Sequence, residues 1–396
     1  MKIGVVGLGL AGLRVARLLE DAGHEVVSFE ARNRIGGRVW TIPDWHYDAG
    51  GEWIDGDHER ILSLAKNYNL SLVTDERPRR IFAFGESISV DDLWGEAVIA
   101  ESHFHREATR LARTPAEQIG PEPTLADLIR RVAPDPRATW WLTATCRSDE
   151  GTDPSDVGLW GWLEFYKMYL NRSGGEHSAY RIKGGLGQLC DAMFEEVQGP
   201  SSFNHVLSSV TQDRSGVKLS FEEQSYKVDA AVLTLPPPAL AQVDFTPKLP
   251  KAQVQAIQQC GMAPIKKVIH RFRESWWERE NWSGSGYYDT PIQQTWNGSW
   301  GSESVLTAYV CGKDSALPIG TPPWDEAPLE VREHDWAADP FAGGGFSYMK
   351  PGFHKLRHLL KEPVGNVFFA GEHTADWMGF LEGALESAER VGTEIL

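Results

Sequence analysis

The sequence has few cysteines and a deficit of positive charge. Four cysteines occur in 396 residues, too far apart for a CxxC motif: Cys146, Cys190, Cys260 and Cys311. This spacing argues against a disulfide framework and against a thiolate metal site. Lysine and arginine total 39 against 55 aspartates and glutamates, a net charge of −16. Such an acidic chain is a poor partner for nucleic acid, and its field favours cationic ligands.

The sequence also lacks targeting and membrane segments. An apolar strand is predicted from Lys2 onward, which leaves no room for a signal peptide. No apolar run long enough to cross a bilayer follows the last predicted helix, so we expect a cytoplasmic protein with no membrane partner. His103, His105 and the pair His354 and His358 have no convincing third ligand, so no metal site is expected. No pattern indicates an oligomeric state.

The N-terminal residues predict a phosphate-binding turn between a strand and a helix. Residues Lys2–Val6 form a short apolar run, typical of a buried parallel strand. The run leads directly into a G-x-G-x-x-G motif made by Gly7, Gly9 and Gly12. The first glycine permits a tight turn, the second lets a diphosphate approach the backbone, and the third lets the helix pack on the strand. Leu10–Ala22 then has the spacing of an amphipathic helix.

A second predicted strand, Glu25–Phe29, ends at the acidic residue Glu30. A carboxylate in that position can accept both ribose hydroxyls of an adenosine. The glycine motif alone does not separate NAD from FAD, but the next residues do. Arg32–Arg38 follows at once and contains Gly36-Gly37-Arg38, whose amides and guanidinium can surround a second side of the diphosphate. NAD enzymes usually continue into another helix here, so the pattern favours FAD.

The C-terminal residues predict the other half of the same site. The apolar strand Val367–Ala370 leads into Gly371 and Glu372, where the carboxylate can bond a ribitol hydroxyl. A helix is expected to begin near Gly379–Leu381 and to point its N-terminus at the flavin pyrimidine ring, where it stabilises negative charge. Together the two ends of the chain predict one FAD held by both termini, and therefore redox chemistry.

With these motifs the chain resembles the flavin-containing amine oxidases, which include monoamine oxidases, polyamine oxidases, L-amino acid oxidases and histone lysine demethylases. The resemblance rests on Gly36-Gly37-Arg38, on residues 48–55 (DAGGEWID) and on the C-terminal motif, with weaker similarity at 181–189, 206–238 and 336–352. It implies FAD contacts at Gly7, Gly9, Gly12, Glu30, Arg32, Gly36, Gly37, Arg38, Gly51, Glu52, Trp53, Val210, Trp336, Gly371, Glu372, Phe380 and Leu381. Some relatives have a cysteine in this stretch that bonds covalently to the flavin. This chain has glycine at that position, near Gly345, so non-covalent FAD is expected.

We expect a fold of mixed α/β and α+β class with two intertwined domains. A discontinuous Rossmann-type FAD-binding domain is predicted for residues 1–75, 181–240 and 337–396. An inserted substrate-binding domain with helices and a mixed sheet is predicted for residues 76–180 and 241–336.

The first part of the inserted domain is predicted to be helical and the second to be a sheet. Asp92–Arg113 is a long amphipathic stretch, Thr124 to Asp127 reads as a capping box, and Gly158–Leu170 is rich in aromatic residues. The alternating stretches Lys267–Phe272 and Val305–Cys311 indicate strands. The resemblance implies that such a sheet covers the flavin.

Lys267 is the lysine that the resemblance places near flavin N5. It precedes Trp277 at the interval at which the family's lysine precedes its motif tryptophan. Lys266 is the alternative, and strand alternation turns only one of the two inward. A lysine there can hold a water at N5 and offer positive charge while oxygen takes electrons.

Phe346 and Phe380 align with the two aromatic residues that flank the amine in monoamine oxidases, usually tyrosines, although the register near Gly343-Gly344-Gly345 is open by one residue. Both are phenylalanine here, which predicts an aromatic slot without hydroxyl groups. Candidates for the substrate pocket are Trp53, Asp55, Trp160, Trp162 and Glu164, and Glu52, Asp55 or Glu164 can hold a distal ammonium.

The predicted function is FAD-dependent oxidation of a small-molecule amine. A neutral amine loses hydride from the carbon beside nitrogen to flavin N5, the imine hydrolyses to an aldehyde or ketone, and molecular oxygen is reduced to hydrogen peroxide. One alternative is an L-amino acid oxidase, but the residues after Gly51 offer no cation for a carboxylate. The other is a flavoprotein desaturase or isomerase. The motifs fit primary, secondary and polyamine substrates, and amines made within a pathway.

Overall fold

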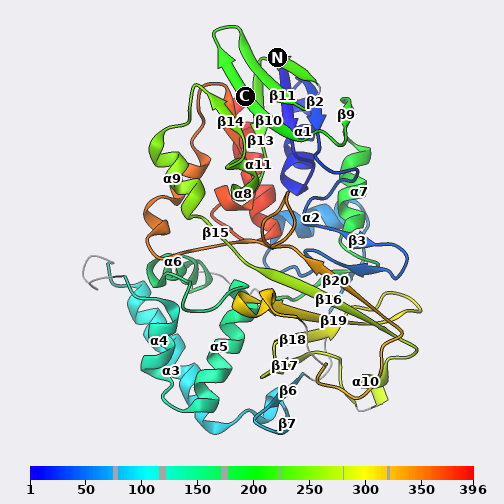
Figure 1. Cartoon of the computed structure of the whole chain (residues 1–396), viewed down its shortest axis with the longest axis vertical. Helices are drawn as coiled ribbons and strands as arrows, with labels where there is room; N and C mark the ends of the chain where they lie inside the picture. The colour runs from blue at the N-terminus through cyan, green and yellow to red at the C-terminus, as the bar shows by residue number, and fades with distance from the viewer. Residues whose placement is uncertain (75–78, 116–121, 171–176, 223, 280, 319–321) are drawn as a thin grey trace.

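A parallel sheet joins segments from both ends of the chain in the computed structural model, which describes all residues except 75–78, 116–121, 171–176, 223, 280 and 319–321. The strand order is β22-β13-β1-β2-β9, and every neighbouring pair is parallel. The strands are β1 (Lys2–Val6), β2 (Glu25–Phe29), β9 (Ser201–Ser202), β13 (Ala230–Leu233) and β22 (Val367–Phe369). Both chain ends lie in this half of the molecule (Figure 1).

Helices cover this sheet because its strands are apolar on both faces. Helix α1 (Leu10–Asp21) and helix α11 (Leu381–Ile395) pack on each other and share one apolar cluster with β1. Helix α7 (Gly187–Glu195) packs on α1, and α2 (Glu59–Asn67) packs on α11. The predicted helix after the glycine motif is therefore confirmed, and the last helix begins where it was expected.

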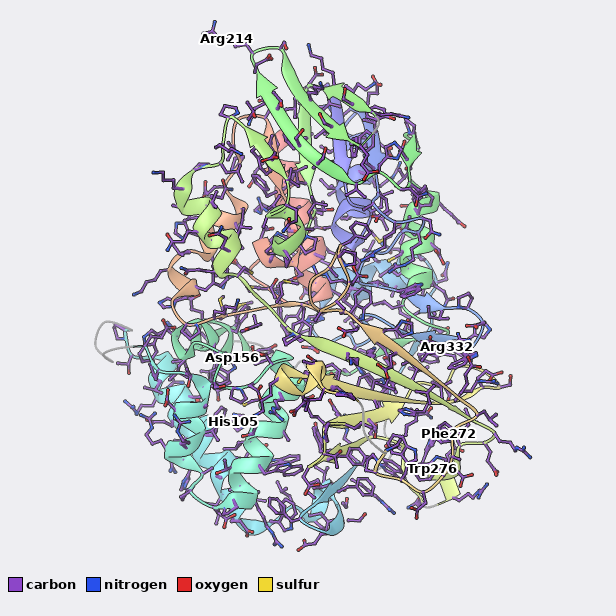
Figure 2. The ribbon with its side chains drawn as sticks, in the orientation of Figure 1. His105, Asp156, Arg214, Phe272, Trp276 and Arg332 are labelled. Atoms are coloured by element: carbon purple, nitrogen blue, oxygen red, sulfur yellow. The ribbon has the colours of Figure 1, made fainter. Side chains whose placement is uncertain are left out.

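A four-stranded sheet of order β12-β11-β10-β14 packs beside the parallel sheet. Its strands are β10 (Leu207–Asp213), β11 (Gly216–Phe221), β12 (Ser225–Val228) and β14 (Asp244–Thr246). Figure 2 shows Arg214 projecting outward from the turn between β10 and β11. Helices α8 (Pro237–Leu240) and α9 (Lys251–Gln259) follow, and α9 shares a core with β22. The domain division stays a prediction, and the packing of β14 and α9 argues for a boundary at about 260 rather than 240.

A seven-stranded sheet forms most of the other half, in the order β20-β16-β19-β18-β17-β6-β7. Its strands are β6 (Arg80–Ala83), β7 (Glu86–Ser89), β16 (Ile265–Phe272), β17 (Gly286–Tyr288), β18 (Gln294–Asn297), β19 (Ser304–Cys311) and β20 (Glu330–Asp335). The two strands predicted from alternation, β16 and β19, pair antiparallel. At the far end of the sheet, Phe272 packs against Trp276, the first residue of helix α10 (Trp276–Arg279) (Figure 2).

Four helices lie beside this sheet (Figure 1): α3 (Gly95–Ala112), α4 (Leu125–Val132), α5 (Pro136–Glu150) and α6 (Leu159–Leu170). The predicted capping box is present, because the Thr124 side chain accepts from the Asp127 amide and Asp127 accepts from the Thr124 amide. Sequence reasoning treated the whole segment 76–180 as helical, and this was wrong for β6 and β7, which form a hairpin. Besides β7, strand β6 pairs in parallel with β17, which is far away along the chain.

Further short strands pair as β3 (Thr41–Ile42) with β4 (Tyr47–Asp48), β5 (Leu72–Val73) with β8 (Arg181–Ile182), and β15 (Gly261–Met262) with β21 (Ser347–Tyr348). The architecture is the one expected, a Rossmann-type sheet with an inserted mixed-sheet and helical part. Among the described residues, no helix combines the length and apolar character needed to span a bilayer.

Candidate active site

A cavity of about 1030 Å³ runs between the two halves of the molecule. One end is walled by the glycine turn after β1 and by the C-terminal motif, and the other by aromatic and acidic residues of α5, α6 and β19. Ligand cavities usually measure about 300–1,000 Å³, so this one is large enough for a cofactor and a substrate together.

The glycine turn leaves bare backbone at the cavity wall. A Cβ atom on Gly12 would lie 1.8 Å from the carbonyl oxygen of Gly7, and Gly7 itself has φ +97°. Gly9 forms a backbone bridge with Gly36, so the two glycine motifs meet. Helix α1 begins at Leu10, and no side chain in the described part of the chain caps its N-terminus. Its free amides therefore suit a phosphate group.

Glu30 is fixed at the tip of β2 by backbone amides. Its two carboxylate oxygens accept hydrogen bonds from the Leu8 amide at 2.8 Å and from the Arg32 amide at 2.9 Å. The carboxylate lines the cavity and keeps lone pairs for the two hydroxyls of a ribose. Arg32 is held in turn by Asp339 at 2.7 Å.

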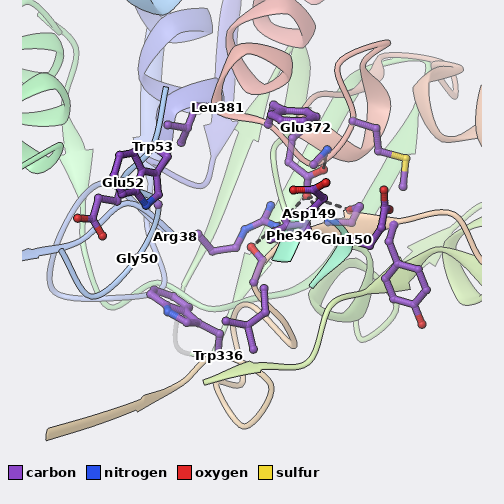
Figure 3. A pocket seen from close by; sticks show the side chains of 18 of the residues that line it. Arg38, Gly50, Glu52, Trp53, Asp149, Glu150, Trp336, Phe346, Glu372 and Leu381 are labelled. Carbon is purple, nitrogen blue, oxygen red and sulfur yellow. Dashed lines mark hydrogen bonds and ion pairs between the residues drawn. The ribbon is translucent and has the colours of Figure 1, made fainter. Parts of the chain in front are cut away.

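Glu372 connects the C-terminal motif to the glycine segment after β2. Its carboxylate accepts from Arg38 Nη1 at 2.7 Å, from the Ser347 hydroxyl at 2.9 Å and from the Gly379 amide at 2.7 Å, and Figure 3 shows Arg38 reaching toward it. Burial raises the pKa of Glu372, but the Arg38 guanidinium outweighs burial, so the pKa lies below its usual value. Helix α11 begins beside this group, and Leu381 of its first turn lines the cavity.

Lys267 lies in the cavity wall, whereas Lys266 points away toward Glu333 and Asp335 at 3.7 and 3.9 Å. The Lys267 ammonium donates to the Gly50 carbonyl at 2.7 Å, to Glu52 Oε2 at 3.0 Å and to the Asp48 carbonyl at 3.1 Å. An ammonium has three hydrogens, so no donor is left for a water in this geometry.

Glu52 is the centre of a buried charge cluster. Besides Lys267, it binds Arg181 at 2.7 Å and the Trp296 indole at 3.0 Å. Burial raises the pKa of Glu52, but Lys267 and Arg181 outweigh it, and the pKa lies below its usual value. Burial and the nearby Glu52 charge raise the pKa of Asp48 to about 7. Lys267 and Arg181 bring two positive charges to the single carboxylate of Glu52, and burial favours the protonated form of Asp48, so this wall carries net positive charge.

The two predicted slot residues both line the cavity. The tip of the Phe346 ring lies against Gly151, where an added Cβ would come within 2.8 Å of Cζ. The Phe380 ring packs edge-on against His58 and Trp377, with centroids 5.3 and 5.7 Å away. At Gly345 an added Cβ would meet Ile265 Cδ1 at 2.4 Å. Glycine at this position has no sulfur to bond the flavin, in agreement with non-covalent FAD.

Most of the predicted cofactor residues lie together in the cavity wall. They are Gly7, Gly9, Glu30, Arg32, Gly36, Gly37, Arg38, Gly51, Glu52, Trp53, Trp336, Gly371, Glu372, Phe380 and Leu381. Gly12 and Val210 lie behind the wall, Gly12 in α1 against the Gly7 carbonyl and Val210 in the core of the four-stranded sheet. Trp336 donates its indole hydrogen to the Ala49 carbonyl at 2.8 Å.

Three of the five predicted substrate residues line the cavity, and two do not. Trp53, Asp55 and Trp162 line the cavity, whereas Trp160 is buried in a core and Glu164 is outside, near Arg357 at 3.5 Å. On helix α6 the cavity residues are instead spaced as one helical face: Trp162, Phe165, Tyr166, Tyr169 and Leu170. Residues two positions from Trp162 point away from that face, and this periodicity was available in the sequence.

Asp55 is already engaged by two histidines. His177 Nδ1 lies 3.4 Å and His58 Nε2 3.6 Å from its carboxylate. Burial raises the pKa of Asp55, but these neighbours, with the Ser178 amide, bring it below its usual value. Asp55, Asp57 and His58 also lie close enough to share a cation, a grouping that the sequence prediction of no metal site did not consider.

Sequence reasoning missed two acidic residues at the other end of the cavity, Asp149 and Glu150. They are the last residues of α5, and both line the cavity. Burial raises the pKa of Asp149 to about 6, and burial with the Asp149 charge raises that of Glu150 to about 8. Adjacent carboxylates at a helix C-terminus oppose the helix dipole, which is the signal in the sequence that marks them.

The chain is similar to flavin enzymes over its whole length. The family described as "Flavin containing amine oxidoreductase" matches residues 10–120, 165–327 and 317–396. An amine oxidase [flavin-containing] of Danio rerio is 25% identical, over 99% of this chain and 85% of that protein. An L-amino acid dehydrogenase of Synechocystis is also 25% identical, over 99% and 94%.

Solved structures show the same fold. Cyclohexylamine oxidase from Brevibacterium oxydans has a TM-score of 0.86 at 22% identity, covering 100% of this chain and 98% of that one. Putrescine oxidase bound to putrescine has a TM-score of 0.86 at 19% identity, covering 100% and 99%.

Proposed function

The chain belongs to the family of flavin-containing amine oxidoreductases and binds FAD, and we propose that it oxidises an amine to an imine with molecular oxygen as the final acceptor. When bound, FAD supplies the two-electron chemistry, accepting hydride at N5 from the carbon beside the amine nitrogen and returning the electrons to oxygen as hydrogen peroxide. The imine then hydrolyses to an aldehyde or ketone.

The observation that supports this proposal is the continuity of the cavity. The glycine turn, Glu30 and Glu372 form one end of the cavity and suit the cofactor, and the aromatic residues form the other end. A substrate between them has Phe346 and Phe380 as apolar walls. These walls hold the substrate in place and exclude water, so that the reacting carbon stays oriented.

The charge cluster at Lys267 has two roles in this proposal. Its net positive charge disfavours an ammonium ion at the reacting end, so the amine binds there as the neutral base. It also stabilises the negative charge that reduction brings to this end of the cavity. No general base is needed when the amine arrives neutral.

The L-amino acid alternative has one observation in its favour, the similarity to the Synechocystis L-amino acid dehydrogenase. A substrate carboxylate needs a cation, but Arg32, Arg38 and Lys267 in the cavity wall already bind carboxylates. Arg79 is an exposed cation in the wall, close to Tyr287. Oxidation of amino acids would therefore depend on Arg79, whereas oxidation of amines would not.

The test is anaerobic mixing of the holoenzyme with separate panels of amines and L-amino acids, followed by the yellow flavin absorption. Bleaching by amines, with peroxide released when air is admitted, is the expected result. Bleaching by amino acids alone, abolished in Arg79→Gln, would replace the proposal by the alternative. If neither panel bleaches the flavin, the proposed function is wrong.

A further inference from the structure

We propose that the hydroxyl oxygen of Tyr309, on β19, accepts a hydrogen bond from the N–H of the reacting amine and so favours primary and secondary over tertiary amines. This inference rests on the proposed function and narrows its substrate class to amines that keep an N–H in the neutral form. A neutral tertiary amine has no such hydrogen. None of the sequence motifs includes Tyr309.

The pairing of β16 with β19 places Tyr309 beside Lys267. The two residues are directly opposite each other in this antiparallel pair, so their side chains share one face of the sheet, with Cβ atoms about 4.5–5.5 Å apart. Trp296 adjoins both, because its ring packs against Tyr309 with centroids 6.0 Å apart and lies 5.1 Å from the Lys267 ammonium. All three side chains line the cavity. The Tyr309 hydroxyl therefore belongs to the wall at which the amine is expected to react.

The C-terminal end of α5 connects this hydroxyl to the predicted aromatic slot. The charges of Asp149 and Glu150 both act on the Tyr309 hydroxyl, which places it near these last residues of the helix. Gly151 follows, and an added Cβ on it would come within 2.8 Å of Cζ of Phe346. Figure 3 shows Asp149 and Glu150 among the side chains that line the cavity with Phe346. The hydroxyl is thus close to the slot as well.

The Tyr309 hydroxyl has no partner within the fold. The side chain is 7% exposed, and among the described residues no group forms a hydrogen bond with its oxygen. Native proteins rarely leave a buried polar atom unsatisfied, so this one points to a ligand. Burial and the charges of Cys311, Asp149 and Glu150 raise the pKa of Tyr309, so the hydroxyl stays neutral.

The neighbouring carboxylate orients the hydroxyl as an acceptor. A neutral hydroxyl has one hydrogen and two lone pairs. Burial raises the pKa of Asp149 to about 6, so Asp149 is mostly ionised at neutral pH and its charge attracts the hydroxyl hydrogen. The lone pairs of the Tyr309 oxygen are then left for the N–H of the substrate.

The hydrogen bond to Tyr309 strengthens during the reaction. Hydride leaves the substrate carbon with both electrons of the C–H bond, and the nitrogen lone pair forms the C=N bond. Positive charge develops on the nitrogen while its N–H stays bonded to the Tyr309 oxygen. A hydrogen bond from a charged donor is stronger than one from a neutral donor, so the hydroxyl stabilises the transition state more than the bound amine.

A tertiary amine loses this interaction. It places a methyl group against the Tyr309 oxygen, which then stays buried and unpaired. A site that hydrogen-bonds a substrate N–H discriminates against an analogue without it for this reason. The specificity of the site therefore depends on one hydroxyl group.

The test measures anaerobic flavin reduction with 1-aminobutane and with its N-methyl and N,N-dimethyl derivatives. The secondary amine is the control for size, because it adds a methyl group and keeps one N–H. For the wild-type holoenzyme we expect kcat/KM, expressed per neutral amine, to be about 10- to 100-fold lower for the tertiary than for the secondary amine. The step from the primary to the secondary amine should be smaller.

Tyr309→Phe should abolish the step between the secondary and the tertiary amine. It should lower the limiting rate of flavin reduction for amines with an N–H and leave the tertiary amine within about twofold. The matched control is Tyr288→Phe, in a buried tyrosine of the same sheet that lies outside the cavity wall. The Tyr288 hydroxyl shares a hydrogen bond of 3.1 Å with Thr295 Oγ1. This control variant should keep the selectivity of the wild type.

Thermal unfolding of the holoenzymes separates a functional hydroxyl from a structural one without turnover. Tyr288→Phe should lower the thermal midpoint, because it breaks a buried hydrogen bond. Tyr309→Phe should leave the midpoint unchanged or raise it, because its hydroxyl has no partner in the described part of the chain. A lower midpoint for Tyr309→Phe with unchanged selectivity would show that the hydroxyl serves the fold and would overturn the inference.

The remaining outcomes separate this inference from the proposed function. Equal kcat/KM for the secondary and tertiary amines in the wild type would overturn the role of Tyr309 and leave amine oxidation intact. If Tyr309→Phe does not fold, the wild-type comparison of the three amines decides. If no amine reduces the flavin, both proposals are overturned.

Discussion

Replacement of Lys267 by methionine tests the cluster of Lys267, Glu52 and Arg181 at the cavity wall. Methionine keeps most of the length of the side chain and removes the ammonium. The variant loses three hydrogen bonds at once, to the carbonyls of Asp48 and Gly50 and to the carboxylate of Glu52. Glu52 keeps Arg181 and the Trp296 indole, but the two carbonyl groups lose a buried donor.

The expected loss of stability follows from burial. Removal of one partner of a buried ion pair costs about 3–5 kcal/mol, because the remaining charge stays in a poorly solvated place. The matched control is Lys266→Met, whose ammonium lies 3.7 and 3.9 Å from half-exposed carboxylates. Pairs of that kind contribute about 0–1 kcal/mol. Neighbouring lysines on one strand are therefore expected to differ by several kcal/mol.

The assay is urea unfolding of the holoenzyme of each variant at neutral pH, followed by flavin fluorescence and far-UV circular dichroism. Adding Glu52→Gln to Lys267→Met should cost further stability, because Arg181, which still pairs with Glu52 at 2.7 Å, is then left as a buried cation without its carboxylate. Oxidation of the reduced flavin by oxygen should also slow in Lys267→Met and not in Lys266→Met. Equal stability of the two lysine variants would refute the reasoning, since it would show that the Lys267 pairing adds nothing to the fold.

Three further results are expected. The folded pKa values of Asp149 and Glu150 are raised to about 6 and about 8, so their protonated forms contribute stability that is fully present below about pH 4 and is lost as pH rises through these values. The double variant Asp149→Asn/Glu150→Gln should therefore have a higher thermal midpoint than the wild type at pH 8 and the same midpoint at pH 4. A difference in midpoint that does not change with pH would contradict the shifts. Glu372→Gln removes the charge bound by Arg38 at 2.7 Å and should weaken FAD binding about tenfold, read as the flavin-to-protein ratio after gel filtration; an unchanged ratio would confine Glu372 to a structural role. The rate of anaerobic flavin reduction should rise with pH toward the pKa of the amine, because the neutral form reacts, and a flat profile would remove that requirement.

The cofactor half of the cavity was predictable because its signals are local. A glycine at Gly7 or Gly12 is required by the turn itself, and the acidic residue at the end of β2 follows within the same βαβ unit. The same holds at the C-terminus, where strand, Glu372 and helix start are consecutive.

The substrate half was less predictable because tertiary packing decides which residues face the cavity. Strand β6 is only four residues long and has its parallel partner, β17, in a distant part of the chain, so its local signal was short. Glu164 was chosen for its charge, although its position two residues from Trp162 turns it to the opposite side of α6. Asp149 faces the cavity because α5 ends there and turns at Gly151, which a composition-based reading does not reveal.

The strand order of the parallel sheet has a consequence for synthesis on the ribosome. Strand β1 is made first, yet it is completed on one side by β13, and β22 and α11 follow only at the end of the chain. A nascent chain therefore has no complete nucleotide site until helix α11 has been made. Contacts between such distant segments slow folding, and free FAD then stabilises only chains that already include α11. Cells starved of the vitamin precursor of FAD should accumulate full-length protein that is prone to degradation.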